Sequence, residues 1–367
     1  GMPTGVIGTV DHHFGDKVWP SELTTPDAIT LQRRLRDLVA LGAKAVAFEV
    51  SSHGIDQGRA SGVDFSCVIF TNLTRDHLDY HKTIENYFAA KERLFRELIA
   101  HSQAPSVTAI INVDDEWGRK IQVAPNAQVG TYGESRSDFQ FQVLATNYSG
   151  TRFRLDSPRG KIEIHSPLVG RHNVYNSVAA IAAGVSAGAS LEICVEGIAK
   201  FRGVPGRLER VPHSGERSVF VDYAHTDDAL RTVLSILSAI RKQSKLKSRI
   251  ITVFGCGGDR DKGKRPLMAQ AAIDHSDIVF VTTDNPRTED PLSIIQDILK
   301  GVPKGLLNSK VFVEIDRREA IRQAIEASSP QDVVLIAGKG HEAYQIIGNT
   351  KHEFSDRLVA GEILSGL

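Results

Sequence analysis

Short apolar runs alternate with helical patterns along almost the whole chain of 367 residues. In the first part of the chain, strands are expected at residues 6–10, 45–50, 66–70 and 108–113. In the last part, strands are expected at residues 219–223, 250–254, 278–282, 311–313 and 333–337. Continuous apolar strands that alternate with helices are typical of largely parallel sheets with helices on both faces. The sequence therefore predicts an α/β protein.

Residues 139–165 follow a different pattern. Apolar and polar residues alternate in three short runs, which predicts an antiparallel appendage, at residues 139–144, 151–155 and 161–165. Helical patterns return at residues 174–187 and 191–201. The segment Gly203-Val-Pro-Gly206 is a plausible hinge. We expect two domains, formed by residues 1–206 and 207–367.

The first helix is predicted from its end signals. Thr25 is expected to be the N-cap, with Pro26 at the first helical position, and Gly42 is expected to end the helix. Its apolar face is predicted to consist of Leu31, Leu35, Leu38 and Val39.

Composition excludes several classes of protein. Lys and Arg number 44, as do Asp and Glu, so no net charge attracts nucleic acid or an anionic membrane. The three cysteines, Cys67, Cys194 and Cys256, are odd in number and widely spaced, which argues against a disulfide framework and fits a reducing cytoplasm. No signal peptide is recognisable, and no apolar run reaches the roughly 18 residues of a membrane span. We expect a cytoplasmic protein that binds neither nucleic acid nor membranes.

The segment from Phe70 to His81 is rich in side chains that can bind metals, and a helix follows it. Lys91 falls on the apolar face of this helix, which consists of Ile84, Phe88, Leu94, Phe95 and Leu98. Burying an unpaired ammonium is costly, so Lys91 should be neutral, paired or modified. A neutral lysine can react with carbon dioxide to form a carbamate, which is a good metal ligand. Alternatively, the side chain runs along the core with its ammonium in water.

Two other patterns admit two interpretations each. Glu49 ends an apolar strand, where a carboxylate can bind Mg²⁺ or can serve as a helix cap or ion-pair partner. Asn173 and Asn176 lie one turn apart at a helix start, where they can contact an adenine edge or cap the helix.

Two further motifs are ambiguous in isolation. Gly255-Cys-Gly-Gly-Asp-Arg260 lacks the third glycine of a dinucleotide fingerprint, so a Rossmann cofactor site is a weak interpretation. The run from Arg260 to Arg265 could also be a solvated charge cluster. Asp284-Asn-Pro-Arg287 contains a common turn signal.

Together these motifs resemble the Mur ligase family, the ATP-dependent amide-bond enzymes of peptidoglycan synthesis. The matching segments occur in family order; they are Glu49-Val-Ser-Ser-His-Gly54, Asn72 to Asp79, Asn173-Val-Tyr-Asn176, Asp222-Tyr-Ala-His225, Gly255 to Arg260, Asp284 to Arg287 and Gly338-Lys-Gly-His-Glu342. They are most similar to the branch that adds meso-diaminopimelate to UDP-N-acetylmuramoyl-L-alanyl-D-glutamate. The resemblance implies a central ATP-binding domain, with a small antiparallel appendage, followed by a Rossmann-like C-terminal domain.

The resemblance also implies roles for particular residues. Mg²⁺ would be bound by Glu49, His77 and Lys91, with Lys91 carbamylated to N6-carboxylysine, and Lys91, His77 and His225 would be catalytic. ATP, a substrate, would be bound by Asn72, Asn173, Asn176, Arg207 and Asp222. The UDP-muramoyl-dipeptide would be bound by Thr24, Thr25, Ser51, Gln57 and Arg59. Diaminopimelate would be bound by Arg260, Asp284, Asn285, Arg287, Gly338 and Glu342.

The chain departs from the family pattern in two places. Thr226-Asp-Asp228 lacks the usual proline after His225, although Asp227 suits a helix N-terminus. No G-x-x-x-x-G-K-[ST] phosphate loop occurs, and the N-terminal uridine-binding domain is not recognisable. We therefore expect a chain that begins inside the central domain, is inactive alone, and is a monomer or weak oligomer.

Three alternatives stay open. A lysine-adding ligase of the same family is disfavoured by Arg287, since lysine lacks the second carboxylate that an arginine would bind. The related folylpolyglutamate synthetase is disfavoured by the segments 284–287 and 338–342. A non-catalytic protein that binds only the amino acid or nucleotide would fit the missing phosphate loop.

Overall fold

The computed structural model describes residues 2–213, 215–244 and 247–367. The chain divides into two compact units. Unit 1 comprises Gly1–Gln142, Arg154–Ile164 and Tyr175–Ile198, and unit 2 comprises Val143–Phe153, His165–Val174 and Ala199–Leu367. The expected domain boundary at residue 206 stays a prediction.

The N-terminal sheet of unit 1 has four strands in the order β3-β2-β1-β4. These strands are β1 (Thr4–Ile7), β2 (Asp11–Phe14), β3 (Lys17–Pro20) and β4 (Ala45–Phe48). Strands β1 and β4 are parallel, as expected, whereas β2 pairs antiparallel with both β1 and β3. The helix α1 (Ala28–Ala40) packs Leu31 and Leu38 against Ile7.

Helix α1 corrects one sequence-based expectation. Its N-cap is Asp27, whose side chain accepts hydrogen bonds from the backbone N–H groups of Ile29 and Thr30. Thr25 lies before the helix, because its hydroxyl is used elsewhere, by the backbone of Glu49 and Ser51. The predicted end is confirmed by Gly42, which has a φ of 95°. Val39 was wrongly assigned to the apolar face, since it is exposed.

The second sheet has six strands in the order β10-β9-β8-β7-β6-β5. They are β5 (Cys67–Phe70), β6 (Val107–Asn112), β7 (Ala127–Gly133), β8 (Phe139–Asn147), β9 (Gly150–Ser157) and β10 (Gly160–Ser166). Strands β5, β6 and β7 are parallel. Two-residue connections join β8 to β9 and β9 to β10, which only antiparallel neighbours allow, so the expected appendage is present.

Helices follow the strands of unit 1. They are α2 (Ser52–Asp56), α3 (Leu78–His81), α4 (Ile84–Arg93), α5 (Arg171–Ser186) and α6 (Leu191–Lys200). Helix α4 continues as a π-helical turn at Leu94–Leu98 and a 3-10 turn at Ile99–His101, and a further 3-10 turn forms at Gly118–Lys120. Tyr87, Leu94 and Phe95 pack with Val68 and Phe70 in the core beneath β5.

Unit 2 contains a six-stranded sheet in the order β11-β12-β16-β13-β14-β15. The strands are β11 (Glu209–Arg210), β12 (Ser218–Asp222), β13 (Ile250–Phe254), β14 (Ile278–Val281), β15 (Val311–Val313) and β16 (Val333–Ala337). All pairs are parallel except β11 with β12. Strands β12, β13 and β16 are fully buried, as expected for continuous apolar runs in a parallel sheet.

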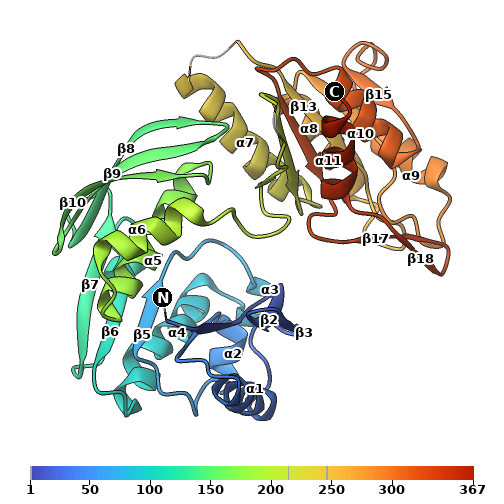
Figure 1. Ribbon diagram of the computed structural model, residues 1–367. Coiled ribbons are helices and arrows are strands. Elements are labelled where there is room, and N and C mark those ends of the chain that lie inside the picture. The colour runs from blue at the N-terminus through green and yellow to red at the C-terminus, as the bar shows by residue number, and fades with distance from the viewer. Residues whose placement is uncertain (1, 214, 245–246) are drawn as a thin grey trace. The chain divides into compact units, whose positions relative to one another are not determined.

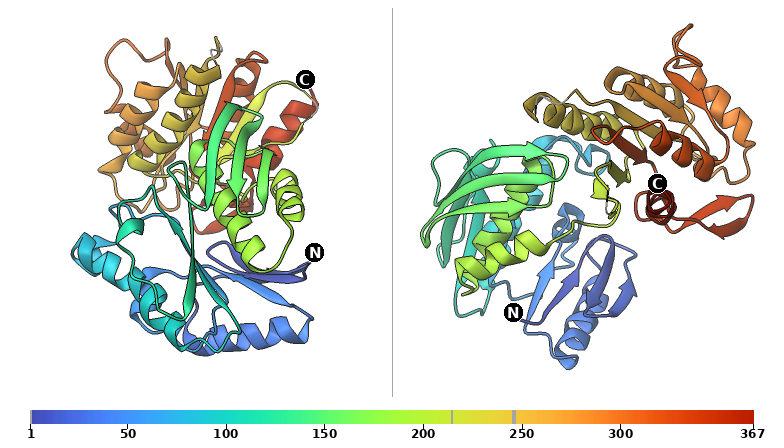
Figure 2. Two further views of the ribbon diagram at one scale, coloured as in Figure 1. Left: turned by 90° about the vertical axis from the view of Figure 1, so that its left-hand side faces the viewer. Right: turned by 45° about the horizontal axis from the view of Figure 1, so that its top comes forward.

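Helices cover both faces of this sheet (Figure 1, Figure 2). One face packs against α7 (Asp227–Ser244), α8 (Lys264–His275) and α9 (Pro291–Leu299). The other face packs against α10 (Arg317–Glu326) and α11 (Asp356–Ser365). A hairpin that the sequence did not predict, β17 (Tyr344–Ile347) with β18 (Thr350–Glu353), precedes α11. The chain is thus a mixed α/β protein, as predicted.

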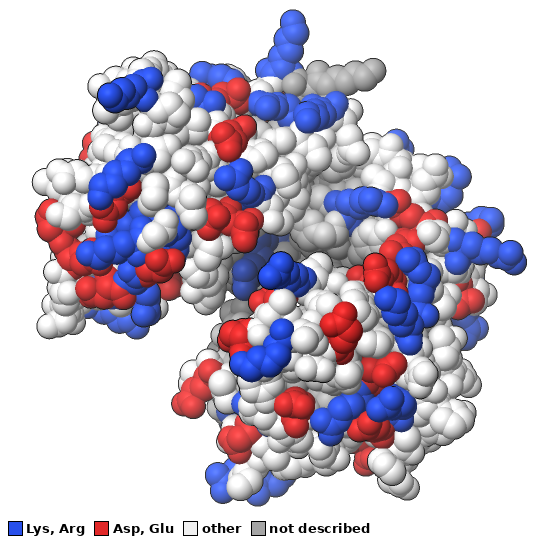
Figure 3. Space-filling view, turned by 180° about the vertical axis from the view of Figure 1, so that it is seen from behind, with Lys and Arg blue, Asp and Glu red and all other residues white. Residues whose placement is uncertain are grey.

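The surface agrees with the balanced composition. On the face drawn in Figure 3, acidic and basic side chains are interspersed. Among the described residues, no helix has both the length and the apolar character of a membrane span.

Candidate functional site

The first group of predicted site residues lines one cavity of unit 1, which we call the Lys91 pocket. Its volume is about 440 Å³. It lies where β4 and β5 end, and Lys91 of α4 contributes to its wall. The predicted site residues that line it are Thr24, Glu49, Ser51, His77 and Lys91.

Lys91 is partly buried and makes no hydrogen bond or ion pair with the residues that the structure describes. Its Nζ atom lies 5.2 Å from the centroid of the Tyr87 ring. Burial lowers the pKa of Lys91, against the smaller opposing influence of Asp115, Asp76 and Glu49. The amine therefore loses its proton more readily than an exposed lysine, as carbamate formation requires.

Glu49 is oriented by a neighbouring loop. Its Oε2 atom accepts hydrogen bonds from the backbone N–H of Thr9 at 3.0 Å and from the Thr9 hydroxyl at 2.8 Å. Glu49 is not a helix cap, because the N-cap of α2 is Ser51, whose Oγ accepts from Gly54 N at 3.0 Å. Within the described part of the chain, no hydrogen bond reaches Oε1. One carboxylate oxygen is thus fixed, and the other is left for a ligand.

His77 occupies the N-cap position of α3 with a φ of 55°, in the left-handed region. Such a conformation is uncommon for a residue with a side chain and often marks a functional site. The His77 ring lies 5.0 Å from that of His53 and 5.7 Å from that of Tyr87, both roughly perpendicular to it. The local backbone thus directs this ring toward the other aromatic groups around the pocket.

Two histidines near the pocket were not assigned any role from the sequence. The His81 ring stacks on Tyr87 at 5.2 Å, and its Nε2 atom lies 3.0 Å from the Ser52 hydroxyl. Burial is the largest of the influences that lower the pKa of His81. The His53 ring lies 5.3 Å from that of His81. In the sequence, the four-residue spacing between His77 and His81 was the signal that could have indicated His81.

Four of the five residues predicted to bind the UDP-muramoyl-dipeptide form one hydrogen-bonded chain beside the pocket, and the fifth, Thr24, shares a hydrogen bond with Thr9. The Thr25 hydroxyl donates to Glu49 O at 3.0 Å and accepts from Ser51 N at 2.9 Å. Arg59 Nη1 donates to Thr25 O at 2.9 Å, and its Nη2 donates to Gln57 Oε1. A Cβ on Gly54 would lie 2.6 Å from the Thr25 side chain, so this position requires glycine.

Asn72 lies in the exposed loop that follows β5. The end of β6 holds this loop, because Asn112 Nδ2 donates to Thr71 O at 2.7 Å and Leu73 N donates to Asp115 Oδ2 at 3.2 Å. The contacts restrain the Asn72 backbone and leave its side chain exposed.

The Lys91 pocket suits a hard cation only if Lys91 is modified. Among the residues that the structure describes, no group of three or more His, Cys, Asp or Glu side chains is arranged to hold a metal ion. Glu49 offers one carboxylate oxygen and His77 one ring nitrogen. A carbamate on Lys91 would add oxygen ligands, which Mg²⁺ prefers. With that addition, the donor set fits Mg²⁺.

The predicted nucleotide residues of unit 2 gather around Tyr223. The Arg207 guanidinium lies 5.5 Å from the Tyr223 ring centroid, and the His225 ring lies 4.7 Å from it. Both oxygens of Asp222 accept backbone hydrogen bonds, from Leu208 N at 2.6 Å and Ala224 N at 2.8 Å. Burial raises the pKa of Asp222. Asp222 therefore shapes the loop that carries the other groups.

The two asparagines lie in the first turns of α5. Asn173 Nδ2 donates to Val169 O at 2.9 Å, so its amide is at least partly engaged by the local backbone. The roles assigned to Asn173 and Asn176 stay predictions.

Three of the residues predicted to bind diaminopimelate, Asp284, Asn285 and Glu342, surround Lys339 in unit 2. We call these four residues the Lys339 cluster. The side chain of Lys339 is fully buried. Its Nζ atom donates to Asn285 Oδ1 at 3.0 Å and to Glu342 Oε2 at 3.1 Å. Asn285 Nδ2 also donates to Glu342 Oε2, at 2.9 Å. Lys339 belongs to the motif Gly338-Lys-Gly-His-Glu342, but the sequence indicated no role for it.

Asp284 is the most deeply buried carboxyl group of this cluster. Burial raises its pKa, and the nearby cations Arg317 and Lys339 oppose that change. Arg317 also pairs with Asp356, with Nη2 and Oδ2 2.7 Å apart. Three carboxylates therefore face two cations. A Cβ on Gly338 would lie 2.6 Å from Asp284 Oδ2, and Gly338 has a φ of 117°, so glycine is required there.

Arg287 and Arg260 lie on two loops that are bonded together. Gly258 N donates to Asn285 O at 2.9 Å, and Arg287 Nη1 donates to Gly258 O at 2.8 Å. Arg287 has a φ of 52°, and its N–H donates to Ile346 O at 3.1 Å. Arg260 lies within the loop between β13 and α8 and is exposed. These backbone contacts set the position of Arg287 before any ligand binds.

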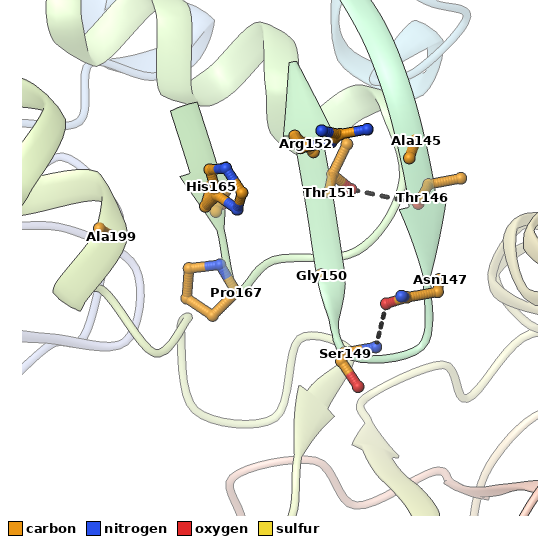
Figure 4. A pocket seen from close by; sticks show the side chains of 11 residues that line it. Ala145, Thr146, Asn147, Ser149, Gly150, Thr151, Arg152, His165, Pro167 and Ala199 are labelled. Atoms are coloured by element: carbon orange, nitrogen blue, oxygen red, sulfur yellow. Dashed lines mark hydrogen bonds between the residues drawn. The ribbon is translucent and has the colours of Figure 1, made fainter. Parts of the chain in front are cut away.

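A second cavity, of about 390 Å³, lies beside the hairpin of β8 and β9 (Figure 4). Thr146 and Thr151 share a hydrogen bond there, and Ser149 N donates to Asn147 Oδ1. None of the predicted site residues lines this cavity.

Comparisons with known proteins identify the family of the chain. The Mur ligase middle domain matches residues 1–184, and the Mur ligase glutamate ligase domain matches residues 206–340. A Geobacter metallireducens protein named UDP-N-acetylmuramoyl-L-alanyl-D-glutamate–2,6-diaminopimelate ligase is 48% identical over 97% of this chain and 72% of its own length. Its Geobacter sulfurreducens counterpart is 46% identical with the same coverage.

A solved structure with the same protein name has a similar fold. It superposes with a TM-score of 0.75 at 38% identity, covering 100% of this chain and 73% of that chain.

Proposed function

The chain belongs to the Mur ligase family, and we propose that it serves the ATP-dependent addition of meso-diaminopimelate to UDP-N-acetylmuramoyl-L-alanyl-D-glutamate in peptidoglycan synthesis. Members of this family are ATP-dependent ligases, so ATP is a substrate. The relatives' names specify 2,6-diaminopimelate as the amino acid, and we extend that substrate to this chain.

The observation that carries the proposal is the charge arrangement in unit 2. Asp284 and Glu342 supply buried or half-buried carboxylates, and Arg287 and Arg260 supply guanidinium groups on the adjoining loops. An amino-acid head group carries an ammonium and a carboxylate on one carbon. The carboxylates can therefore bind the ammonium of a zwitterionic amino acid, and the guanidinium groups can bind its carboxylate.

Arg287 distinguishes diaminopimelate from lysine in this proposal. Diaminopimelate has a carboxylate on its distal carbon, where lysine has only hydrogen. An arginine can bind that carboxylate through two parallel hydrogen bonds. When lysine binds, the fixed Arg287 guanidinium would have no ligand carboxylate to pair with. This difference favours diaminopimelate.

The Lys91 pocket would serve the phosphoryl-transfer step. The γ-carboxylate of the D-glutamyl residue attacks the γ-phosphorus of ATP, releasing ADP and forming an acyl phosphate. The amine of diaminopimelate then attacks the acyl carbon, the amide forms, and phosphate leaves. Glu49, His77 and carbamylated Lys91 would hold Mg²⁺, which would stabilise negative charge on the transferring phosphoryl group.

The remaining residues would bind and orient the substrates. In unit 1, the bonded chain of Thr25, Ser51 and Arg59 would orient the dipeptide. In unit 2, Arg207 and His225 would contact the nucleotide phosphates and ribose. Because UDP-sugars and ATP are cytoplasmic metabolites, we propose a cytoplasmic location. The oligomeric state stays a prediction.

Calorimetric titration of the chain with meso-diaminopimelate and, separately, with L-lysine tests the amino-acid assignment. We expect saturable binding of diaminopimelate and binding of lysine that is weaker by about 30-fold or more, from the loss of a charge-assisted bidentate contact. Tighter binding of lysine would overturn the substrate assignment, and an absence of binding by either amino acid would overturn the proposed role of unit 2.

A further inference from the structure

Lys339 is a lysine with no exposed side-chain surface, placed two residues after the end of strand β16. Its flanking glycines have positive φ values, 117° at Gly338 and 54° at Gly340, so the backbone turns sharply on both sides of it. Burying an ammonium is costly unless hydrogen bonds and opposite charges compensate it. Because solvent does not reach the Lys339 side chain, groups of the protein must compensate its charge.

The hydrogen bonds of Lys339 involve particular atoms of two predicted ligand-binding residues. Its Nζ atom reaches Asn285 Oδ1 and Glu342 Oε2. Ile346 N also donates to Asn285 Oδ1, at 2.9 Å. These donors fix the orientation of the amide, with its oxygen toward Lys339 and its Nδ2 toward Glu342. Asn285 is thus oriented by three neighbours.

The same bonds orient Glu342. Two donors, Lys339 Nζ and Asn285 Nδ2, use Oε2 of this carboxylate. The Tyr344 hydroxyl also hydrogen-bonds the Glu342 carboxylate. Since a carboxylate has about four lone-pair sites, at least one site remains for a donor from the ligand. Without Lys339, Glu342 would face Asp284 with one cation fewer nearby, and the repulsion would favour rotation or protonation of a carboxyl group.

We propose that Lys339 is a positioning residue for the incoming amino acid, because it holds Glu342 through Oε2 and keeps a lone-pair site of this carboxylate for the distal ammonium group of the ligand. This inference rests on the proposed function of the Lys339 cluster. It gives Lys339 no contact with the ligand, so its effect is transmitted entirely through Glu342 and Asn285.

The test measures the affinities of meso-diaminopimelate and 2-aminopimelate for the unchanged protein and for Lys339→Met. 2-Aminopimelate lacks one of the two amino groups of meso-diaminopimelate and is otherwise the same chain. In calorimetric titrations, the unchanged protein should bind diaminopimelate about 10- to 100-fold more tightly than 2-aminopimelate, as expected for a hydrogen bond between charged groups. In Lys339→Met, this ratio should fall to near one, since Glu342 is no longer held. Partial unfolding would weaken the binding of both ligands by the same factor, so a fall in the ratio reports on Glu342 and not on folding.

A matched control is Lys304→Met, which removes an exposed lysine of the same unit. Its ratio should equal that of the unchanged protein. An undiminished ratio in Lys339→Met would overturn the positioning role while leaving the proposed function intact. Failure of the unchanged protein to bind diaminopimelate would overturn the proposed function and, with it, this inference.

A crystal structure of the unchanged protein with meso-diaminopimelate provides a second test that does not depend on how the variant folds. We expect Lys339 Nζ to stay on Glu342 Oε2 and the ligand ammonium to lie within hydrogen-bond distance of the Glu342 carboxylate. Direct contact between Lys339 and the ligand, or separation of Glu342 from Lys339, would overturn the proposal.

Discussion

Two lysines near the carboxyl ends of strands show how differently the two units treat a buried cation. Lys339 in unit 2 is fully buried and hydrogen-bonded to Asn285 and Glu342. Lys91 in unit 1 is partly buried and has no hydrogen-bond partner in the described part of the chain. The Lys339 cluster is therefore organised by its own hydrogen bonds, whereas the Lys91 pocket would be completed by the modification and the ion that we propose.

The difference has an electrostatic consequence. Burial without a partner lowers the pKa of Lys91 and favours the neutral amine, which is the reactive form of lysine toward carbon dioxide. Lys339, in contrast, donates hydrogen bonds to Asn285 and Glu342.

The largest expected effect is on stability in unit 2. Lys339→Met removes one of the two cations near Glu342 and Asp284 and leaves Arg317 as the other, so the free energy of unfolding should fall by about 3–5 kcal/mol. Urea unfolding measures this change. The matched control is Lys120→Met, which breaks an exposed pair with Glu116 whose atoms are 2.8 Å apart, and should cost at most about 1 kcal/mol. Equal decreases in the free energy of unfolding of the two variants would contradict the expected difference between the buried Lys339 cluster and an exposed ion pair.

The next effect concerns selectivity. Arg287→Lys replaces a planar guanidinium by a single ammonium and should reduce the preference for diaminopimelate over lysine by about 30- to 1,000-fold, or about 2–4 kcal/mol. Calorimetry with both amino acids measures the ratio. Arg318→Lys, at an exposed arginine paired with Glu362, is the control and should leave the ratio unchanged. If the ratio of the affinities for diaminopimelate and lysine is unaltered in Arg287→Lys, the selectivity must come from Arg260 or Glu342.

The smallest effect is opposite in sign and belongs to unit 1. Lys91→Met removes a desolvated amine that lacks a partner, so in the absence of metal and bicarbonate the free energy of unfolding should rise by about 1 kcal/mol at neutral pH. Because the folded pKa of Lys91 is lowered, the unfolded state binds more protons, and the unchanged protein gains stability as pH rises toward the ordinary lysine pKa of about 10.4.

The difference between this variant and the unchanged protein should therefore shrink as pH rises, in unfolding experiments at a series of pH values. A variant that is less stable at every pH would show that Lys91 is satisfied as a cation.

Most of the parallel strands were predictable because their buried apolar runs are continuous, as in Val333–Ala337. The parallel strand β7 was missed, because polar residues and glycine interrupt its apolar residues. Strands β2, β3, β17 and β18 were missed, because short hairpin strands with exposed polar residues lack that signal. The start of α1 was misjudged because Thr25 and Asp27 are both good caps, and only the tertiary bonds of Thr25 to Glu49 and Ser51 decide between them.

The candidate site shows the same limit. The sequence indicated Lys91 through a break in an apolar pattern, which periodicity alone can reveal. Lys339 lies in a glycine-rich loop, where no periodicity marks it as buried. Its hydrogen bonds to Asn285, which is distant in the sequence, arise from the parallel order of the sheet strands that precede the two loops. Such contacts require the fold.

The central claim is that Lys91, and not Lys339, is a reactive amine in a pocket that a carbamate and Mg²⁺ complete. Nuclear magnetic resonance of the protein with isotope-labelled bicarbonate and saturating Mg²⁺ tests it most directly. We predict one carbamate signal in the unchanged protein, which is absent from Lys91→Met and retained in Lys339→Met. A carbamate signal that survives in Lys91→Met, or no signal in the unchanged protein at saturating bicarbonate and Mg²⁺, would contradict the account.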